Sequence, residues 1–536
     1  MGQNIPGHAQ ITLRWTPLSE PCVVRLLHPR DRPGRCTVAE KLYDERVDTP
    51  PDAEGYERGL GSRQIQMIAI GGAIGTGLFL GAGTAISRSG PSLILSYAVA
   101  GLVIFVIMRA LGELLTYRPV SGSFAEYARE FLGPFAGYVT GWTYWLFWVV
   151  TGMAETTAAA VYVRFWAPGI PQWASALTFL VLLYAANLIS VKLFGEIEFW
   201  FSMVKVTAII GMILIGVGVL TLGFSKAGDT ASLGHLWQDG GFFPEGIGST
   251  VMTLQIVMFA YLGVELVGVT AGESENPEKT LPRAINTLPW RIMLFYIGAL
   301  VVILSLVPWT EFRPGVSPFV AAFGKIGIPA AAGIINFVVL TAALSSCNSG
   351  MYSTGRMLRD LALRGQAPGR LTRLNSRRTP AFAITVSCLL MGIGVVLNGV
   401  VPARAFEYIT SVATVCGLWT WAMILISQIR YRRAWRAGHL PPPTFKAPGG
   451  TWVSGAALAF LAVVVVLIAL DRDNRISLFV FPVWALLLVG GYQVLKRRDP
   501  QAVLGAAPDG APASAGNAPT GNTLDGNALD GNVDAR

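Results

Sequence analysis

The sequence predicts an all-α membrane protein with twelve transmembrane helices, and three observations support this fold class. Hydrophobic residues make up 52% of the 536 residues and charged residues only 14%, which excludes a soluble fold for most of the chain. Apolar runs follow one another from residue 64 to residue 495, and each is near the roughly 20 residues that a spanning helix needs. Basic residues gather in alternate loops between these runs.

The predicted spans are separated by short polar segments, without an insertion large enough for a soluble domain. They cover residues 64–86, 92–115, 134–162, 173–191, 199–222, 247–271, 289–308, 329–354, 380–399, 405–428, 452–470 and 477–495. We therefore expect a single domain with a core, the transmembrane domain of residues 58–498. The polar, Pro- and Arg-rich residues 1–57 and the Ala-, Gly- and Asn-rich residues 499–536 are predicted to be disordered cytoplasmic arms.

The distribution of basic residues predicts the orientation of the chain in the membrane. Loops on one side of the spans hold 23 Lys and Arg, against eight on the other side: Arg88, Arg164, Lys226, Arg313, Lys325, Arg404, Arg472 and Arg475. The positive-inside rule then places both termini in the cytoplasm. We further expect the membrane to be a bacterial inner membrane. The net charge of +9 forms no continuous basic face, so a nucleic acid partner is not expected.

The first predicted span carries a run of small residues, Gly71 to Gly77. Several glycines cost about 1 kcal/mol each relative to alanine in a continuous helix, so the run indicates either close helix packing or an unwound segment. An unwound segment at membrane depth frees backbone groups, which is tolerable only where they face a cavity or a ligand. The start of the second half-helix, at Thr76 and Gly77, would then direct N–H groups at a carboxylate.

A second candidate interruption lies in the sixth span, from Phe259 to Glu265. Interruptions at corresponding positions of two halves of a chain indicate a transporter site near the membrane midplane. A zwitterionic amino acid would be bound through N–H groups and through carbonyls of Ala73, Phe259 and Leu262, with the ring of Phe259 or Tyr261 acting as a gate or only packing. The predicted substrate-binding residues are Ala73, Ile74, Gly75, Thr76, Gly77, Phe259, Tyr261 and Leu262.

Ionisable side chains inside predicted spans are the other candidates, because such groups are costly in a membrane. Lys205 is interpreted either as a proton carrier or as a permanent cation that holds broken-helix carbonyls. Glu265 and Glu155 are candidates for a proton or gating role, although Glu265 could instead bond the freed backbone of its own turn. Arg109 and Glu113, four residues apart, predict an ion pair on one face of the second helix.

Two further segments are polar where the surrounding sequence is apolar. Ser345, Ser346, Asn348 and Ser349 in the eighth span predict either interhelical hydrogen bonds or the lining of a cavity. Residues 273–283 predict a short amphipathic cytoplasmic helix that precedes the seventh span.

Neither an enzyme nor a channel is expected from these residues. His8, His28, His235 and His439 all lie outside the predicted spans, and neither zinc-ligand nor P-loop spacing occurs. The five cysteines are scattered, so no disulfide framework, metal site or cofactor is expected. A channel would need a repeated filter or a ring of pore-lining residues, and neither is visible.

Six segments together resemble the amino acid permeases of the amino acid–polyamine–organocation superfamily. They are GGAIGTGLF (71–79), PVSGSFAEY (119–127), GWTYWLFWVVTGMAE (141–155), FGEIEFWF (194–201), AGESENPEKTLPRAI (271–285) and SSCNSGMYSTGRML (345–358), in family order. Within the family, HLWQDGGFFPEG (235–246), the Trp-rich third helix and the segment 471–484 resemble the bacterial D-serine/D-alanine/glycine transporters most closely. The segment 119–123 follows the broader permease pattern instead.

The resemblance implies a leucine-transporter fold, with five plus five inverted helices and two extra helices at the end. It also implies import of small neutral amino acids such as D-alanine, D-serine or glycine by proton symport. A fifth-helix lysine like Lys205 occupies the place of sodium in sodium-coupled relatives, which favours the proton. Other neutral amino acids, such as gamma-aminobutyrate, proline or an aromatic one, remain the alternative substrates.

Overall fold

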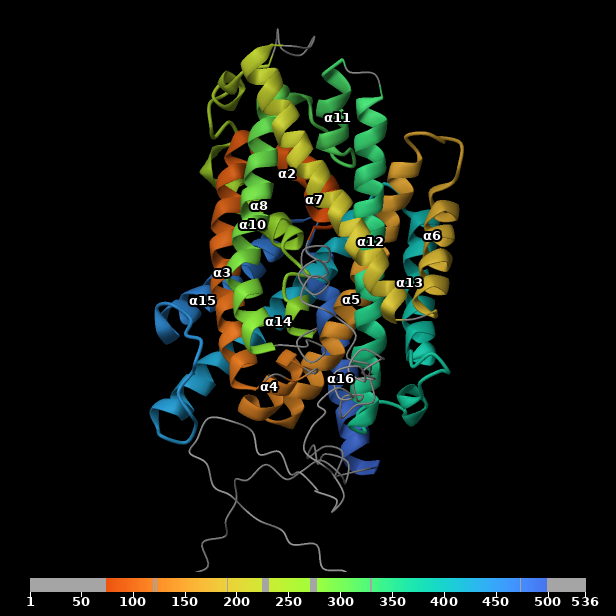
Figure 1. Ribbon diagram of the computed structural model, residues 1–536, viewed down its shortest axis with the longest axis vertical. Coiled ribbons are helices and arrows are strands. Elements are labelled where there is room, and N and C mark those ends of the chain that lie inside the picture. The colour runs from red at the N-terminus through yellow and green to blue at the C-terminus, as the bar shows by residue number, and fades with distance from the viewer. Residues whose placement is uncertain are drawn as a thin grey trace, which may run out of the picture. The chain divides into compact units, whose positions relative to one another are not determined.

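The structure is a computed structural model, described for residues 74–118, 120, 123–189, 191–223, 231–269, 277–327, 330–472 and 474–498. Within these ranges all regular structure is helical (Figure 1). The predicted arms, residues 1–57 and 499–536, lie outside the described residues, as do Gly71, Gly72 and Ala73.

The helices follow one another through short connections. The first half of the chain contains η1 (Gly77–Gly81), α2 (Ala82–Ser89), η2 (Gly90–Ser92), α3 (Leu93–Tyr117), α4 (Ser123–Leu132), α5 (Pro134–Val163), α6 (Gln172–Asn187), α7 (Val191–Leu222), η4 (Leu233–Leu236), α8 (Gly246–Ala260) and α9 (Leu266–Val269). The second half contains α10 (Pro277–Leu306), η6 (Trp309–Glu311), α11 (Pro318–Lys325), α12 (Ala331–Leu363), η7 (Gly369–Thr372), α13 (Ala381–Val400), α14 (Ala405–Arg436), α15 (Gly450–Leu470) and α16 (Ile476–Arg498).

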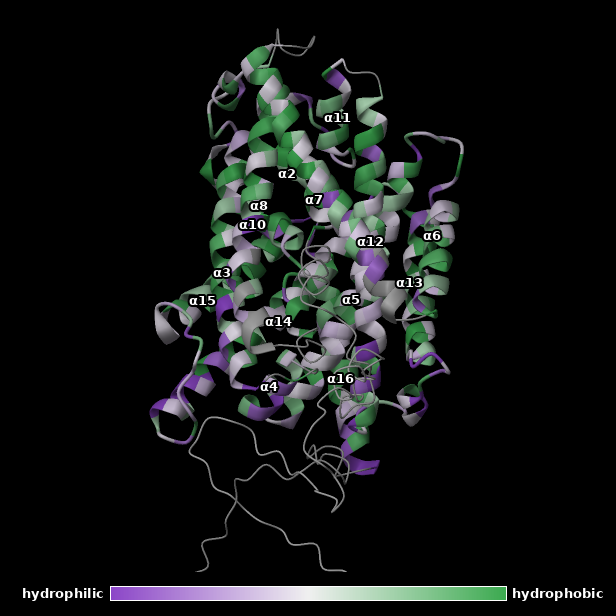
Figure 2. Cartoon of the chain, in the orientation of Figure 1, coloured by the Kyte–Doolittle hydropathy of each residue, from purple (hydrophilic) through white to green (hydrophobic). Residues whose placement is uncertain are grey.

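Among the described residues, nine helical segments are long and apolar enough to cross a membrane. The first of these joins η1, α2, η2 and α3, which the sequence predicts as two spans. Figure 2 shows hydrophobic residues along most of the long helices and hydrophilic ones gathered at the lower ends. These features are those of a polytopic membrane protein.

One predicted boundary is wrong, at the seventh span. The sequence predicts a separate amphipathic helix over 273–283 and a span that starts at residue 289, whereas α10 runs without a break from Pro277 to Leu306 with Pro282 and Pro289 inside it. Each proline removes one backbone hydrogen bond, but α10 packs along α3 and α7, and tertiary packing of this kind keeps a proline-containing helix continuous.

The helix α5 lies at the centre of the bundle. It packs against α4, α6, α12, α13 and α14 (Figure 1), and it is the most deeply buried of the long helices, whereas α16 is the least buried. One continuous hydrophobic cluster extends from η1 to α15. The central position of α5 means that a side chain on its buried face lies deep inside the bundle.

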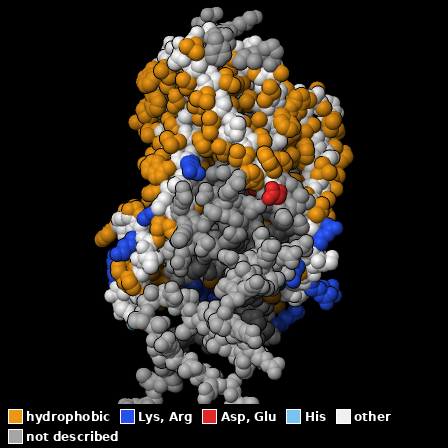
Figure 3. Space-filling model, viewed as in Figure 1, with side chains coloured by type: hydrophobic (Ala, Val, Ile, Leu, Met, Phe, Trp, Pro, Cys, Tyr) orange, Lys and Arg blue, Asp and Glu red, His pale blue; other side chains and the backbone are white. Residues whose placement is uncertain are grey.

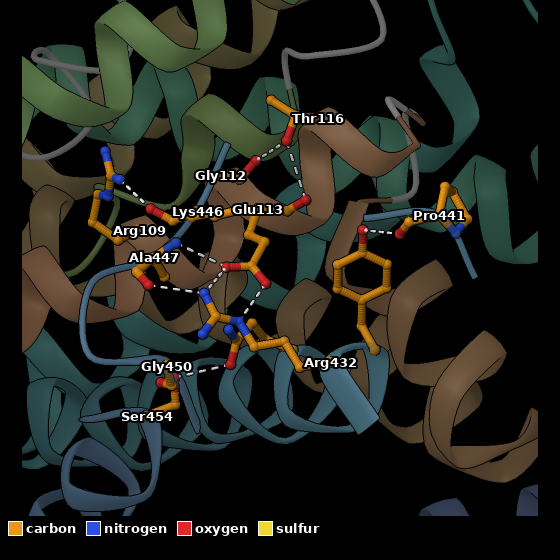
Figure 4. A network of polar contacts seen from close by, with 12 residues as sticks. Arg109, Gly112, Glu113, Thr116, Arg432, Pro441, Lys446, Ala447, Gly450 and Ser454 are labelled. Carbon is orange, nitrogen blue, oxygen red and sulfur yellow. Dashed lines mark hydrogen bonds and ion pairs between the residues drawn. The ribbon is translucent and has the colours of Figure 1, made fainter. Parts of the chain in front are cut away.

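The predicted ion pair between Arg109 and Glu113 is also wrong. Glu113 is fully buried, and both of its oxygens accept hydrogen bonds from Arg432 of α14 at 2.6 Å. The Ala447 N–H donates to the same carboxylate at 2.8 Å, so Glu113 joins α3 to α14 and to the segment before α15 (Figure 4). Arg109 donates instead to Asn286 and to the Lys446 carbonyl. Arg109 and Glu113 lie on one face of the helix, as their spacing predicts, but each side chain bonds residues from other parts of the chain instead of the other.

This buried pair yields a stability prediction. Arg432→Ala leaves the Glu113 carboxylate buried without its cation, so we expect a loss of about 3–5 kcal/mol. The matched control is Arg118→Ala, because Arg118 is 46% exposed and pairs with Glu130 at 3.1 Å on the surface. We expect that control to change stability by about 1 kcal/mol or less. Thermal unfolding of the purified protein measures both, and equal shifts for the two variants would contradict the account.

Candidate functional site

The described part of the first membrane segment begins with residues that are not helical. Ile74 and Gly75 form a bend. Thr76 is the N-cap residue of the π-helical segment η1, and its side chain makes no capping hydrogen bond. The Thr76 N–H donates to Oε1 of Glu155 on α5, with an N···O distance of 3.4 Å. An uncapped helix start leaves N–H groups free for an acceptor from elsewhere in the molecule. In this structure the acceptor is the buried Glu155 carboxylate.

The sixth helix is interrupted within the predicted range. The helix α8 ends at Ala260, α9 begins at Leu266, and Gly263 between them has a φ of +94°, which favours glycine. Both oxygens of Glu265 accept from the Gly263 N–H, at 3.3 and 3.1 Å, and the Trp421 indole N–H donates to Oε2 at 3.2 Å. Glu265 therefore bonds the freed backbone of its own turn, which was one of its two predicted roles.

The two interrupted helices meet at Gly77 and Ala260. A Cβ atom on Gly77 would lie 2.5 Å from the Cα of Ala260, so only glycine permits this approach. Beside this contact is a small cavity lined by Gly75, Gly77, Thr151, Glu155, Phe259, Ala260, Leu262 and Ser346. Its free volume, ≈ 10 Å³, is about what one water molecule needs. The cavity is too small for an amino acid, so a substrate would have to displace side chains to enter.

Phe259 separates this cavity from a second one. It lines both cavities, and the second is also lined by Arg88, Gln255 and Phe406. The rings of Phe259 and Phe406 meet edge to face with centroids 6.2 Å apart. Asp471 accepts from Arg88 at 2.8 Å and from Gln255 at 2.5 Å, which ties α2 and α8 together at the second cavity. The Phe259 ring thus lies where a gate between the two cavities would be.

Tyr261, the other predicted aromatic, is placed differently. Its ring is fully buried against Tyr97 and Tyr296, and its hydroxyl donates to the Tyr97 carbonyl at 2.8 Å. The Tyr296 hydroxyl donates to the Ala260 carbonyl at 2.8 Å, so one carbonyl freed at the end of α8 already has a donor. These tyrosines hold the interruption of the sixth helix against α3 and α10, and Tyr261 does not line either cavity.

Lys205 on α7 is fully buried among acidic groups. Its charge interacts with Glu198, on the same helix, and with Glu155 on α5. Glu198 was not among the sequence-predicted residues, yet it is fully buried and accepts from the Ser345 hydroxyl at 2.6 Å. One signal was available: Glu198 and Lys205 are seven residues apart, two helical turns, and therefore lie on one face.

The polar patch of α12 fulfils both of its predicted roles. Ser346 lines the small cavity and bonds Glu155, whereas Ser345 bonds Glu198 on α7. Asn348 accepts from Asn187 of α6 at 2.7 Å. The patch therefore joins α12 to its neighbours and at the same time forms one wall of the cavity.

Comparison with known proteins gives the family. Residues 64–504 match the amino acid permease family. The chain belongs to that family. Among curated relatives, the permease is 50% identical to the uncharacterized amino acid permease YtnA of Bacillus subtilis (strain 168) over 435 residues, 81% of this chain and 94% of the relative.

Two further relatives have named substrates. The D-serine/D-alanine/glycine transporter of Escherichia coli (strain K12) is 46% identical over 455 residues, 84% of the permease and 96% of that protein. The L-asparagine permease of the same organism is 44% identical over 448 residues, covering 83% of the permease and 90% of the relative. These relatives are named transporters and permeases, so the permease is a transport protein and not an enzyme.

Proposed function

We propose that this permease imports small neutral amino acids, with D-alanine, D-serine and glycine as substrates, by proton symport with alternating access. One observation supports the proposal most directly: two interrupted helices meet at Gly77 and Ala260, beside a cavity walled by the buried Glu155. Backbone groups freed at membrane depth require a ligand or a cavity. An amino acid supplies a carboxylate for the N–H groups and an ammonium group for the carbonyls.

In the proposed binding mode the substrate carboxylate takes the N–H groups of Thr76 and Gly77, beside Ile74 and Gly75. Glu155 now accepts the Thr76 N–H at 3.4 Å, a long bond that an entering carboxylate would replace. The ammonium group is assigned to the carbonyls of Phe259 and Leu262 and to that of Ala73, which lies outside the described residues. Phe259 is assigned the gate, and Tyr261 supports the interruption of the sixth helix.

Proton coupling is assigned to the buried charges of Lys205, Glu155 and Glu198. Lys205 interacts electrostatically with each of the two glutamates, and groups coupled in this way can exchange protons when the cavity opens to either side of the membrane. Glu265 is assigned a gating role, because its carboxylate holds the turn of the sixth helix through Gly263. In this proposal no sodium ion takes part in transport.

The finer architecture is part of the same proposal: twelve spans over residues 58–498 in a leucine-transporter fold, with both termini cytoplasmic. The weakly buried α16, together with α15, corresponds to the two extra helices of that fold. In the visible face of Figure 3, Lys and Arg side chains lie over the lower part and hydrophobic ones cover the upper part. The positive-inside rule assigns the lower part to the cytoplasm.

The rival substrate is a larger neutral amino acid. The L-asparagine permease, 44% identical, supports this alternative among the relatives, and gamma-aminobutyrate, proline and aromatic amino acids belong to it as well. The small free volume of the cavity favours the smaller substrates, because each added side-chain atom requires further displacement of Phe259 or Leu262.

Uptake measurements test the substrate. Cells that express the permease should take up labelled D-alanine with saturable kinetics, and excess D-serine or glycine should compete. A protonophore should abolish the uptake. L-asparagine, gamma-aminobutyrate, proline and phenylalanine serve as competitors for the rival. If one of these competes better than D-serine and glycine, the proposed substrate class is wrong, whereas uptake that persists with the protonophore would refute the proton coupling alone.

A further inference from the structure

We propose that the permease binds the phosphate group of an anionic phospholipid between the first turns of α14 and α16. The site is a cavity lined by Arg404, Tyr408, Arg472, Arg475, Ile476 and Phe479, with a volume of ≈ 290 Å³. It shares no lining residue with the cavities at the interrupted helices, but it neighbours the second of them, because Glu407 and Asn474 of that cavity are adjacent in sequence to Tyr408 and Arg475.

The basic residues of this cavity are unusual for their side of the membrane. Only eight Lys and Arg occur in the loops on the side with fewer basic residues, and three of the eight line this one cavity. Elsewhere on that side, Arg88 pairs with Asp471 and Lys325 pairs with Glu311. The positive-inside rule explains why Lys and Arg are frequent on the cytoplasmic side, but it does not explain a cluster of arginines on the opposite side.

The local geometry favours an anion. Arg472 and Arg475 lie in the turn that leads into α16, and Arg475 N–H donates to the Asp471 carbonyl at 3.0 Å. Arg404 precedes the first residue of α14 and donates to the Tyr408 hydroxyl oxygen at 3.3 Å. The positive ends of two long helices therefore meet at the cavity. No ion pair joins Arg472 or Arg475 to a carboxylate of the described residues, and Asp473 lies outside those residues.

The apolar neighbours identify the source of the phosphate as a lipid. Ile476 and Phe479 line the same cavity, and Phe479 is 69% exposed on the outer surface of α16. In the membrane that surface faces acyl chains, because α16 is the least buried of the long helices. Arginine binds phosphate through two parallel hydrogen bonds, and the Phe479 ring next to it suits the first carbons of a lipid tail.

Lipid titration of the purified full-length permease tests the proposal. Native mass spectrometry and the thermal unfolding midpoint are followed while phosphatidylglycerol, phosphatidylcholine or inorganic phosphate is added. We expect phosphatidylglycerol to bind and to raise the midpoint, and phosphatidylcholine to do so much more weakly. Arg472→Gln/Arg475→Gln should weaken phosphatidylglycerol binding roughly tenfold. The matched control, Lys496→Gln/Arg497→Gln, loses two positive charges at the other end of α16 and should keep the wild-type affinity.

A second variant separates charge from geometry. Arg472→Lys/Arg475→Lys keeps both charges but loses paired hydrogen bonding, so its affinity should fall between wild type and the Gln variant. Equal binding by wild type and the Gln variant, or an equal loss in the control, would overturn the proposal. Equal stabilisation by inorganic phosphate alone would show that the site takes free phosphate, and the lipid assignment would then fall.

Discussion

We expect Gly77→Leu to reduce D-alanine uptake to background while the protein remains in the membrane. A Cβ atom on Gly77 would lie 2.5 Å from the Cα and 2.9 Å from the backbone N of Ala260, and backbone cannot swing aside as a side chain can. The two interrupted helices would have to separate, so the N–H groups and the carbonyls assigned to the substrate would no longer converge. Gly77→Ala should act in the same direction.

The matched control for this substitution lies one turn along the same segment. A Cβ atom on Gly81 would meet nothing nearer than the Thr76 carbonyl oxygen at 4.0 Å, so Gly81→Ala should keep wild-type uptake. Labelled uptake normalised to the amount of protein in the membrane compares the variants. Wild-type transport by Gly77→Leu would show that the close contact between Gly77 and Ala260 is not needed for transport.

A second large effect is expected at Lys205. Lys205→Gln should abolish uphill accumulation of substrate but keep exchange of internal for external substrate, because exchange does not require the protonation state to be reset. Glutamine keeps the length and the hydrogen bonding of the side chain but cannot carry a proton. The buried Glu198 and Glu155 would also lose the cation that both now face, so we expect a lower unfolding midpoint as well.

Arginine at the same position separates the two interpretations of Lys205. If Lys205 carries the proton, Lys205→Arg should also fail to accumulate substrate, because arginine is effectively never deprotonated. If Lys205 only holds the first helix as a permanent cation, arginine should restore part of the accumulation. Restored accumulation in Lys205→Arg would therefore assign the proton to Glu155 or Glu198.

Much of the helical framework could be predicted because the membrane leaves few alternatives. The interruption of the sixth helix was predictable from Gly263 and Glu265, since glycine and a carboxylate inside an apolar run both disfavour an unbroken helix. The burial of Lys205 and Glu155 followed from the same cost of charge in lipid. Such features can be predicted from local composition, because a charge or an unpaired backbone group is costly at any position within the bilayer.

Other features depended on partners far away in the sequence. The predicted fifth span begins at residue 199 and so leaves Glu198 outside it, whereas α7 begins at Val191 and includes Glu198. Glu113 bonds Arg432, which is 319 residues away, and helical spacing carries no information about such a pair. The placement of Tyr261 against Tyr97 and Tyr296 likewise follows from the packing of α3 and α10.

The most direct test of proton-coupled amino acid import uses purified permease in sealed lipid vesicles without sodium. An imposed pH gradient, acidic on the outside, should drive labelled D-alanine to an internal concentration above the external one, and the accumulation should collapse when a protonophore is added. An inward sodium gradient without a pH gradient should drive none. Accumulation that requires sodium and ignores the pH gradient would contradict the account.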